Sequence, residues 1–166
     1  MNKIKKIFSI DIRALALMRM GLALLILADL WMRSRHLIAH YTDEGVLPRL
    51  QVINLLSSNT ICAYLMGSSV GFTIALFVLA ALLAVCVFIG YRTTLVTCLS
   101  WFLLQSLHAR NLWVNNGGDI YFQSLLFWGM FLPWGAIWSI DSLKKKHQEI
   151  IPQQVLTMAT VGLMLQ

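Results

Sequence analysis

Long apolar runs separated by short polar segments are the dominant pattern along this chain. A helix needs about 20 apolar residues to cross a bilayer, because the hydrocarbon core is about 30 Å thick and each residue adds about 1.5 Å. Runs that approach or reach this length predict membrane-spanning helices over residues 12–31, 71–90, 95–108 and 120–140. We expect Pro133 to kink the last helix, since membrane helices tolerate proline where neighbouring groups bond the freed carbonyl.

A fifth apolar run, over residues 155–166, is shorter than the others. A helix of about 12 residues is about 18 Å long, which is little more than half of a bilayer. The pattern therefore predicts an incomplete fifth span, and we expect these residues to be the N-terminal portion of a longer membrane domain. The expected fold class is all-α: a polytopic transmembrane helical bundle with four full spans plus a truncated fifth.

The composition favours lipid as the solvent of this bundle. Hydrophobic residues make up 58% of the chain and charged residues 12%, with a mean hydropathy of +0.73. A soluble domain is about half apolar and about a quarter charged, so this chain has too little polar surface to coat a water-soluble globule. The first apolar run is not followed by a small-residue cleavage site, and we interpret it as a retained helix rather than a signal peptide.

Basic residues flank the apolar runs, which accounts for the formal net charge of +6 without a nucleic-acid partner. A cytoplasmic N-terminus places eight of the 13 Lys and Arg residues inside, four outside and one within a span. An excess of Lys and Arg in cytoplasmic loops is the usual orientation signal. The sequence thus predicts a multi-pass protein of the cell (inner) membrane, with the bilayer as partner. The eight inside residues are Lys3, Lys5, Lys6, Arg13, Arg92, Lys144, Lys145 and Lys146.

Two ionisable residues, Arg19 and Asp29, lie inside the first apolar run. Charged groups in a span are costly and are often functional. A structural role is equally open for each: Arg19 could extend its side chain to the nearby interface, and Asp29 could pair with Arg33 four residues later. If the helix continued, His36 and His40 would fall near the same face.

Two polar segments are expected on the extracytoplasmic side. Residues 40–49 hold an Asp-Glu-Gly turn, after which Pro48 could open a short helix, and residues 50–66 are apolar enough for a short interfacial helix. Residues 108–119 hold an Asn-Gly-Gly turn, with Asp119 as the expected N-cap of the fourth helix. The candidate polar site consists of Asp43, Glu44, Arg49, Arg110, Asn115, Asn116 and Asp119.

Residue types alone leave the chemistry of these segments open. The carboxylates, histidines and tyrosine of residues 36–49 could support acid–base work, although a solvated loop is the simpler interpretation. Backbone amides at the start of the fourth helix, beside Arg110, could hold an anion or a polarised carbonyl. No spacing typical of a metal site, a nucleophilic triad or a phosphate loop is present. We interpret the cysteines as small buried hydrophobes: Cys62, Cys86 and Cys98.

Four segments in this order resemble the HTTM family, the membrane domains related to vitamin K-dependent gamma-carboxylase. They are residues 15–22 leading to Asp29, residues 41–49, Arg110-Asn111 with residues 116–119, and residues 131–133 through 139–141. The resemblance implies a bundle with a cytoplasmic N-terminus, an active side facing the lumen or periplasm, and a reduced quinone of the vitamin K type as cofactor. In the carboxylase, oxygenation of that quinone generates a strong base, which removes a glutamate gamma-proton before carbon dioxide adds.

The chain departs from the carboxylase pattern at two points. The animal enzyme has a histidine after the paired asparagines, where this chain has Gly117, and the family's proposed catalytic lysine lies on or just after the fifth helix, beyond Gln166. The resemblance therefore implies no catalytic residue in this chain, and carboxylase (lyase) activity only in a longer protein. Two other functions stay open: a non-enzymatic membrane scaffold, and a quinone-reactive four-helix subunit of the DoxX type.

Overall fold

Helices make up most of the computed structural model, which describes residues 8–56, 60–67, 69–144 and 154–166. An all-α fold is therefore confirmed. The long helices are α2 (Ile12–Ser34), α5 (Val70–Ile89), α6 (Thr93–Arg110) and α7 (Gly117–Gly129). The short elements are α3 (Leu37–Tyr41), α4 (Arg49–Leu55), the 3₁₀ turn η1 (Ala63–Leu65), α8 (Ile140–Lys144) and α9 (Met158–Leu165).

One short strand pair was not expected from the sequence. Strand β1 (Ile10–Asp11) pairs with β2 (Gln154–Val155) in antiparallel orientation, with Ile10 opposite Val155. The pair brings the segment before α2 next to the segment before α9, which packs against α7. Five of the basic residues expected on the cytoplasmic side lie outside the described residues: Lys3, Lys5, Lys6, Lys145 and Lys146.

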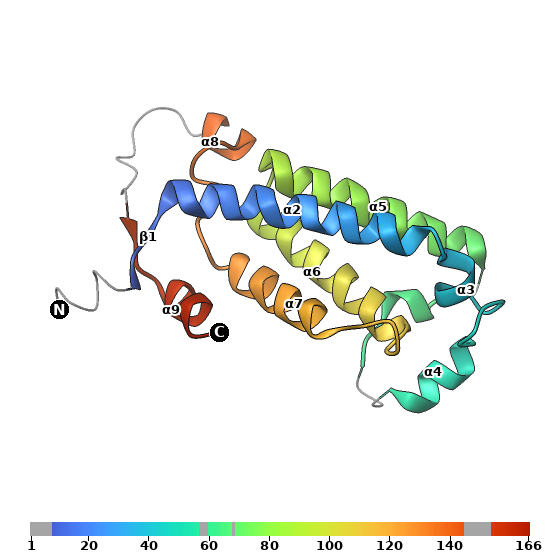
Figure 1. The fold of residues 1–166 in the computed structure, drawn as a ribbon. Coiled ribbons are helices and arrows are strands. Elements are labelled where there is room, and N and C mark those ends of the chain that lie inside the picture. The colour runs from blue at the N-terminus through green and yellow to red at the C-terminus, as the bar shows by residue number, and fades with distance from the viewer. Residues whose placement is uncertain (1–7, 57–59, 68, 145–153) are drawn as a thin grey trace.

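The four long helices form a bundle in sequence order. Helix α2 packs along α5, α5 along α6, and α6 along α7 (Figure 1). Helices α3 and α4 lie at one end, which we call the distal end, where α2 and α6 finish and α5 and α7 begin. The opposite, proximal end holds the start of α2, the end of α5 and helix α8. Successive long helices thus run in alternating directions.

Two of the described helices, α2 and α5, are long and apolar enough to cross a membrane. They have 23 and 20 residues respectively. Helix α6 has 18 residues and α7 has 13, and neither meets the same criterion. The bundle also exposes large apolar side chains along these helices, as expected where lipid rather than water surrounds a protein: Leu24, Leu25, Ile74, Val78, Leu82 and Val85.

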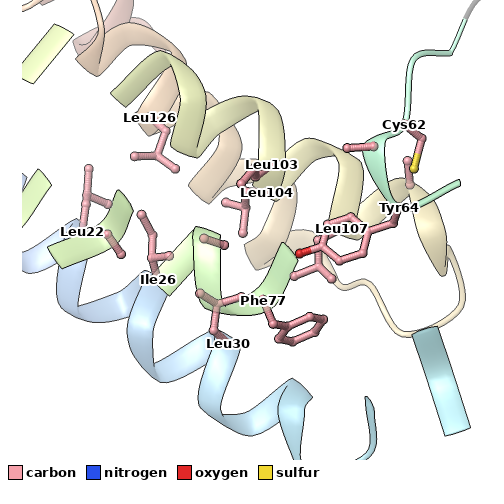
Figure 2. Close-up of a cluster of buried hydrophobic side chains, with 14 of the residues drawn as sticks. Leu22, Ile26, Leu30, Cys62, Tyr64, Phe77, Leu103, Leu104, Leu107 and Leu126 are labelled. Carbon is pink, nitrogen blue, oxygen red and sulfur yellow. The ribbon is translucent and has the colours of Figure 1, made fainter. Parts of the chain in front are cut away.

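The core lies where α2, α5, α6 and α7 meet. Apolar side chains recur at helical spacing on their facing sides, and this spacing buries one stripe of each helix. Figure 2 shows this cluster, which runs along the bundle toward the distal end. Its members include Leu22, Ile26 and Leu30 of α2, Phe77 of α5, Leu103, Leu104 and Leu107 of α6, and Leu126 of α7.

The predicted helix over residues 120–140 is wrong in its second half. Helix α7 ends at Gly129, and turns follow before α8 begins at Ile140, so Pro133 does not kink a continuous helix. The turns bring the buried Trp134 ring back onto α7, where a Cβ atom added to Gly129 would overlap that ring. Glycine at position 129 therefore provides the space that this return requires.

The segment between α2 and α5 matches its sequence-based prediction more closely than residues 120–140 do. Helix α4 begins at Arg49 directly after Pro48, as predicted. The apolar stretch over residues 50–66 contributes most of α4 and the η1 turn, while residues 57–59 lie outside the described part. Helix α2 stops at Ser34 instead of continuing, yet the rings of His36 and His40 still meet edge to face.

We expect Gly129→Ala to lower the free energy of unfolding by about 1–3 kcal/mol, because the added methyl group overlaps a buried ring that has no room to move. Gly21→Ala is the matched control, since no heavy atom lies within 4 Å of a Cβ added there. This control should be neutral or gain up to about 1 kcal/mol. Chemical denaturation of the purified variants in detergent measures both values, and equal losses would contradict the packing of Trp134 on α7.

Candidate functional site

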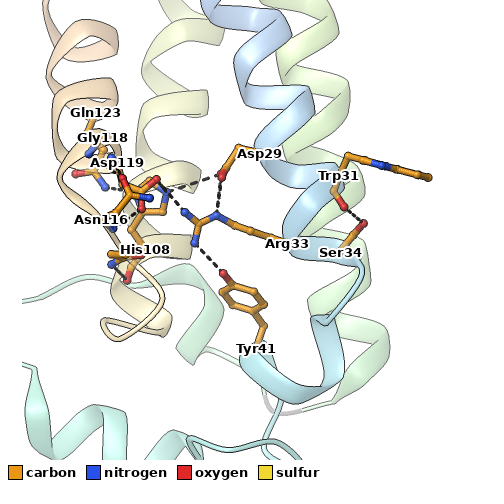
Figure 3. Close-up of polar contacts among 11 residues, drawn as sticks. Asp29, Trp31, Arg33, Ser34, Tyr41, His108, Asn116, Gly118, Asp119 and Gln123 are labelled. Carbon is orange, nitrogen blue, oxygen red and sulfur yellow. Dashed lines mark hydrogen bonds and ion pairs between the residues drawn. The ribbon is translucent and has the colours of Figure 1, made fainter.

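The guanidinium group of Arg33 is the centre of a buried polar cluster at the distal end. Its Nε donates to Asp29 Oδ1 at 2.8 Å and its Nη2 to Asp119 Oδ1 at 2.9 Å. Its Nη1 donates to the Tyr41 hydroxyl at 2.9 Å. Arg33 is only 9% exposed. One arginine thus joins two carboxylates and a phenol that come from α2, α3 and α7 (Figure 3), a use of the planar, five-donor guanidinium that lysine could not copy.

His108, near the end of α6, completes this cluster. Its ring is 3% exposed, and its Nε2 lies 3.9 Å from both Asp29 Oδ2 and Asp119 Oδ1. Within the described residues this Nε2 has no hydrogen-bond partner. The other ring nitrogen, Nδ1, contacts the Gln123 side-chain amide. If the amide nitrogen faces Nδ1, then Nδ1 accepts and Nε2 carries the proton that faces the carboxylates. If the amide oxygen faces Nδ1 instead, Nδ1 carries the proton and Nε2 has a free lone pair. We call Asp29, Arg33, Tyr41, His108 and Asp119 the Arg33 cluster.

A capping box at the start of α7 orients Asp119. Asn116 is the N-cap residue, and its side chain accepts from the amides of Gly118 and Asp119. In return Asp119 Oδ2 accepts from the Asn116 amide at 2.9 Å, which leaves Oδ1 for Arg33. The prediction that Asp119 itself is the N-cap is therefore wrong by three positions, because the asparagine before the glycine pair takes that role.

The charges of the Arg33 cluster allow it to hold one more proton. Two carboxylates face one arginine, so the cluster carries one net negative charge when the His108 ring is neutral and none when that ring is doubly protonated. Burial raises the pKa of the Tyr41 hydroxyl, and the neighbouring Arg33 only partly offsets this. Tyr41 therefore stays protonated at neutral pH.

A cavity of about 230 Å³ adjoins the Arg33 cluster. Asp29 is the carboxylate that reaches toward it, with a side chain 18% exposed. Apolar side chains contribute to the lining as well, so the cavity offers a mixed surface beside the acid–base groups. The lining residues are Asp29, Met32, Arg33, His36, His40, Tyr41 and Val114.

A second polar group at the distal end is built around Arg110. Its Nη1 donates to the Leu47 carbonyl at 2.8 Å and its Nη2 to Asp43 Oδ1 at 3.3 Å. The same Asp43 oxygen accepts from the Arg49 amide at 2.8 Å. Arg110 is 1% exposed, so these bonds fasten residues 43–49 to the end of α6.

The sequence-predicted site residues therefore fall into two groups. Asp43, Arg49 and Arg110 form the group just described, while Asp119 belongs to the Arg33 cluster with Asn116 as its cap. Asn115 links to the same cluster through its Nδ2, which donates to the His108 carbonyl at 2.8 Å. Glu44 is exposed to solvent. The structure thus places only part of the predicted set around one centre.

Sequence reasoning left Arg33, Tyr41, His108 and Gln123 out of the candidate site. The pairing of Asp29 with Arg33 was foreseen, because it is local, and it is confirmed. In the sequence, His108 lies at the boundary between an apolar run and a polar segment. This pattern does not show which residues its ring contacts. Those partners come from α2 and α7, 79 and 11 positions away in the printed sequence.

Arg19 forms a third network, near the proximal end. It is completely buried, so the expectation that it reaches the interface is wrong. Its Nη1 donates to the carbonyls of Val87 at 2.6 Å and Phe88 at 2.7 Å. Its Nε and Nη2 donate to the carbonyls of Trp134 at 3.1 Å and Trp138 at 2.6 Å. Arg19 thereby donates to carbonyls in the last turn of α5, where helix carbonyls lack intrahelical partners. The Val87 carbonyl also accepts from the Gly90 amide of the C-cap.

The cysteines differ from one another in environment. Cys62 is buried, its thiol donates to the Ser106 carbonyl at 3.1 Å, and burial raises its pKa. Cys86 is half-buried and Cys98 is exposed, so the interpretation as buried hydrophobes holds fully only for Cys62. Among the described residues, no group of His, Cys, Asp or Glu is placed to hold a metal ion.

Comparison with known proteins returns no matching family model, curated protein or solved structure. What the chain itself defines is a helical bundle with two candidate membrane spans and a buried ionic cluster at its distal end.

We expect Arg19→Met to lower the free energy of unfolding by about 3 kcal/mol or more. Methionine fills similar space, but it leaves the carbonyls of Phe88, Trp134 and Trp138 without this donor, and each buried unpaired group costs about 1–3 kcal/mol. The control is Arg35→Met at an exposed position, which should change stability by no more than about 0.5 kcal/mol. Denaturation in detergent measures both variants, and a similarly small effect at Arg19 would refute the carbonyl network.

Proposed function

We propose that this chain is a multi-pass integral membrane protein of the HTTM type. The two candidate spans, the alternating helix directions and the apolar outer surface support this assignment. In this arrangement α6 crosses the bilayer beside α2 and α5. Helix α7, whose 13 residues span about 20 Å, crosses it together with the turns of residues 130–139. The N-terminus lies in the cytoplasm, and the Arg33 cluster lies at the extracytoplasmic end of the bundle.

The distribution of Lys and Arg supports this orientation, because eight lie on the proposed cytoplasmic side and four on the other. At the distal end Arg33 and Arg110 are buried against carboxylates and serve the fold. At the proximal end Arg13 is exposed, and in sequence it follows the N-terminal lysines.

The segments that carry the HTTM resemblance meet in the buried networks. Asp29, Tyr41 and Asp119 come from the first three segments and converge on Arg33. The fourth segment, residues 131–141, supplies the carbonyls that Arg19 binds. Residues from four separate segments thus form two compact polar networks. This is the arrangement expected if the segments act together in one fold.

The Arg33 cluster is, in this proposal, an acid–base site for a lipophilic substrate. The observation that carries it is the position of His108 Nε2, which is buried, unbonded and 3.9 Å from two carboxylates. For this role the Gln123 side-chain oxygen faces Nδ1, so that Nδ1 carries the proton and Nε2 has the free lone pair. Nε2 then takes a substrate proton by way of Asp29, the carboxylate that lines the adjoining cavity, and the two carboxylates stabilise the imidazolium. Arg33 holds both carboxylates in place, and Tyr41 fixes the guanidinium. The HTTM resemblance points to a reduced quinone of the vitamin K type, which would supply an acidic hydroxyl in the adjoining cavity.

The proposed topology is tested by labelling single cysteines in a cysteine-free background. Glu44→Cys at the distal end should react with an impermeant maleimide added outside intact cells, because Glu44 is exposed there. Leu143→Cys at the proximal end, where Leu143 is 84% exposed, should react only after the membrane is permeabilised. The reverse pattern would overturn the orientation, and extraction of the chain by alkaline carbonate would overturn the membrane assignment.

The acid–base role is tested by the rate at which the chain, in lipid nanodiscs, oxidises a reduced vitamin K-type quinone in air. We expect His108→Gln to slow this rate about a hundredfold, the usual effect of losing a general base, while Tm stays within a few degrees of wild type. Added imidazole should partly restore the rate of His108→Ala. A structural histidine would show no such rescue. A wild-type chain without quinol oxidation would disprove the substrate class, and equal rates would leave the scaffold function as the better account.

A further inference from the structure

A cavity of about 840 Å³ opens at the proximal end, remote from the Arg33 cluster. It lies between the start of α2, the end of α5 and residues 136–143. Its volume is in the range of about 300–1,000 Å³ typical of ligand sites. Most of the lining is apolar and includes Met20, Phe88, Ile89, Ile137 and Leu143.

The charged side chain in the described lining of this cavity is positive. It belongs to Arg13, which is exposed. Arg19 lies behind the wall: its Nη2 donates to the carbonyl of Trp138, which also lines the cavity. The described hydrogen bonds of Arg19 all go to backbone carbonyls, and Asp141 acts on it through its charge.

Asp141, the acidic residue next to the lining segment, is engaged elsewhere. Its carboxylate accepts from the amides of Arg92 and Thr93, both at 2.8 Å, and from the Thr93 hydroxyl. It therefore caps the start of α6. In the sequence, three lysines (residues 144–146) follow Leu143 directly.

Trp138 gives the cavity an aromatic edge. It is 56% exposed, and its backbone has a positive φ of 50°, which is rare for a bulky residue. The bond from Arg19 to its carbonyl helps to hold this conformation. Half-exposed tryptophans are typical of the membrane–water interface, where the ring meets lipid headgroups.

We propose that this cavity binds one anionic glycerophospholipid of the cytoplasmic leaflet. The lipid phosphate pairs with Arg13, and an acyl chain lies along Phe88, Ile137 and Leu143, with the Trp138 ring at headgroup level. An open, mostly apolar groove with one cation in its lining fits such an amphiphile, and anionic lipids are enriched in that leaflet. The proposal rests on the membrane location and orientation proposed above, and it is independent of the His108 chemistry.

Lipid binding is tested with the full chain in detergent by native mass spectrometry and by thermal unfolding, with phosphatidylglycerol or phosphatidylcholine added. We expect phosphatidylglycerol to bind and to raise Tm by several degrees more than phosphatidylcholine does. Arg13→Gln should weaken phosphatidylglycerol binding about fivefold, as expected for one basic residue near an anionic lipid. The matched control is Arg35→Gln, an exposed arginine at the distal end, which should leave binding unchanged.

The position of the bound lipid is tested by quenching of tryptophan fluorescence. Phosphatidylglycerol with brominated acyl chains should quench the wild-type chain more than it quenches Trp138→Phe. Soluble glycerol phosphate should change neither Tm nor fluorescence. Equal affinity for both phospholipids, equal loss in Arg13→Gln and Arg35→Gln, or a response to glycerol phosphate alone would each overturn the proposal. If these tests fail while the cysteines label as expected, the lipid proposal is wrong and the proposed membrane topology still stands.

Discussion

The burial of three arginines is the constraint on which the rest of this structure depends. Arg19, Arg33 and Arg110 are at most 9% exposed, and a buried guanidinium is tolerated only where acceptors surround it. Because helices use their own carbonyls internally, the acceptors come from helix ends, loops and carboxylates. Acceptors come from residues 134–138 for Arg19, from Tyr41 and the first turn of α7 for Arg33, and from residues 43–47 for Arg110.

The same constraint produces the candidate site. Arg33 donates to two carboxylates, whose combined negative charge is larger than its single positive charge. The buried His108 ring lies 3.9 Å from both carboxylates. At the proximal end the bonding differs, since the described hydrogen bonds of Arg19 go to neutral carbonyls and Asp141 acts on it through its charge. The proposed proton chemistry at one end and the proposed anion site at the other start from this difference in bonding.

Much of the fold was predictable because apolar length is a local property. The predicted helices over residues 12–31, 71–90 and 95–108 agree with α2, α5 and α6 to within three residues at each end. The prediction over residues 120–140 was wrong because the carbonyls of Trp134 and Trp138 serve Arg19, more than a hundred positions earlier. The local pair Asp29–Arg33 was foreseen, whereas the place of His108 depends on packing between α2, α6 and α7.

The two ends of the bundle can be studied as separate units. Arg19 and Arg33 are 14 positions apart on α2, which corresponds to about 21 Å along the helix. Substitutions separated by more than about 10 Å and sharing no partner are usually additive. Because Arg13 lies still farther from the Arg33 cluster along α2, removal of its charge tests the lipid cavity without altering the His108 site. Coupling between the two ends would instead require α2 to shift as a rigid rod, and the Arg19 network opposes such a shift by fastening α2 to the end of α5.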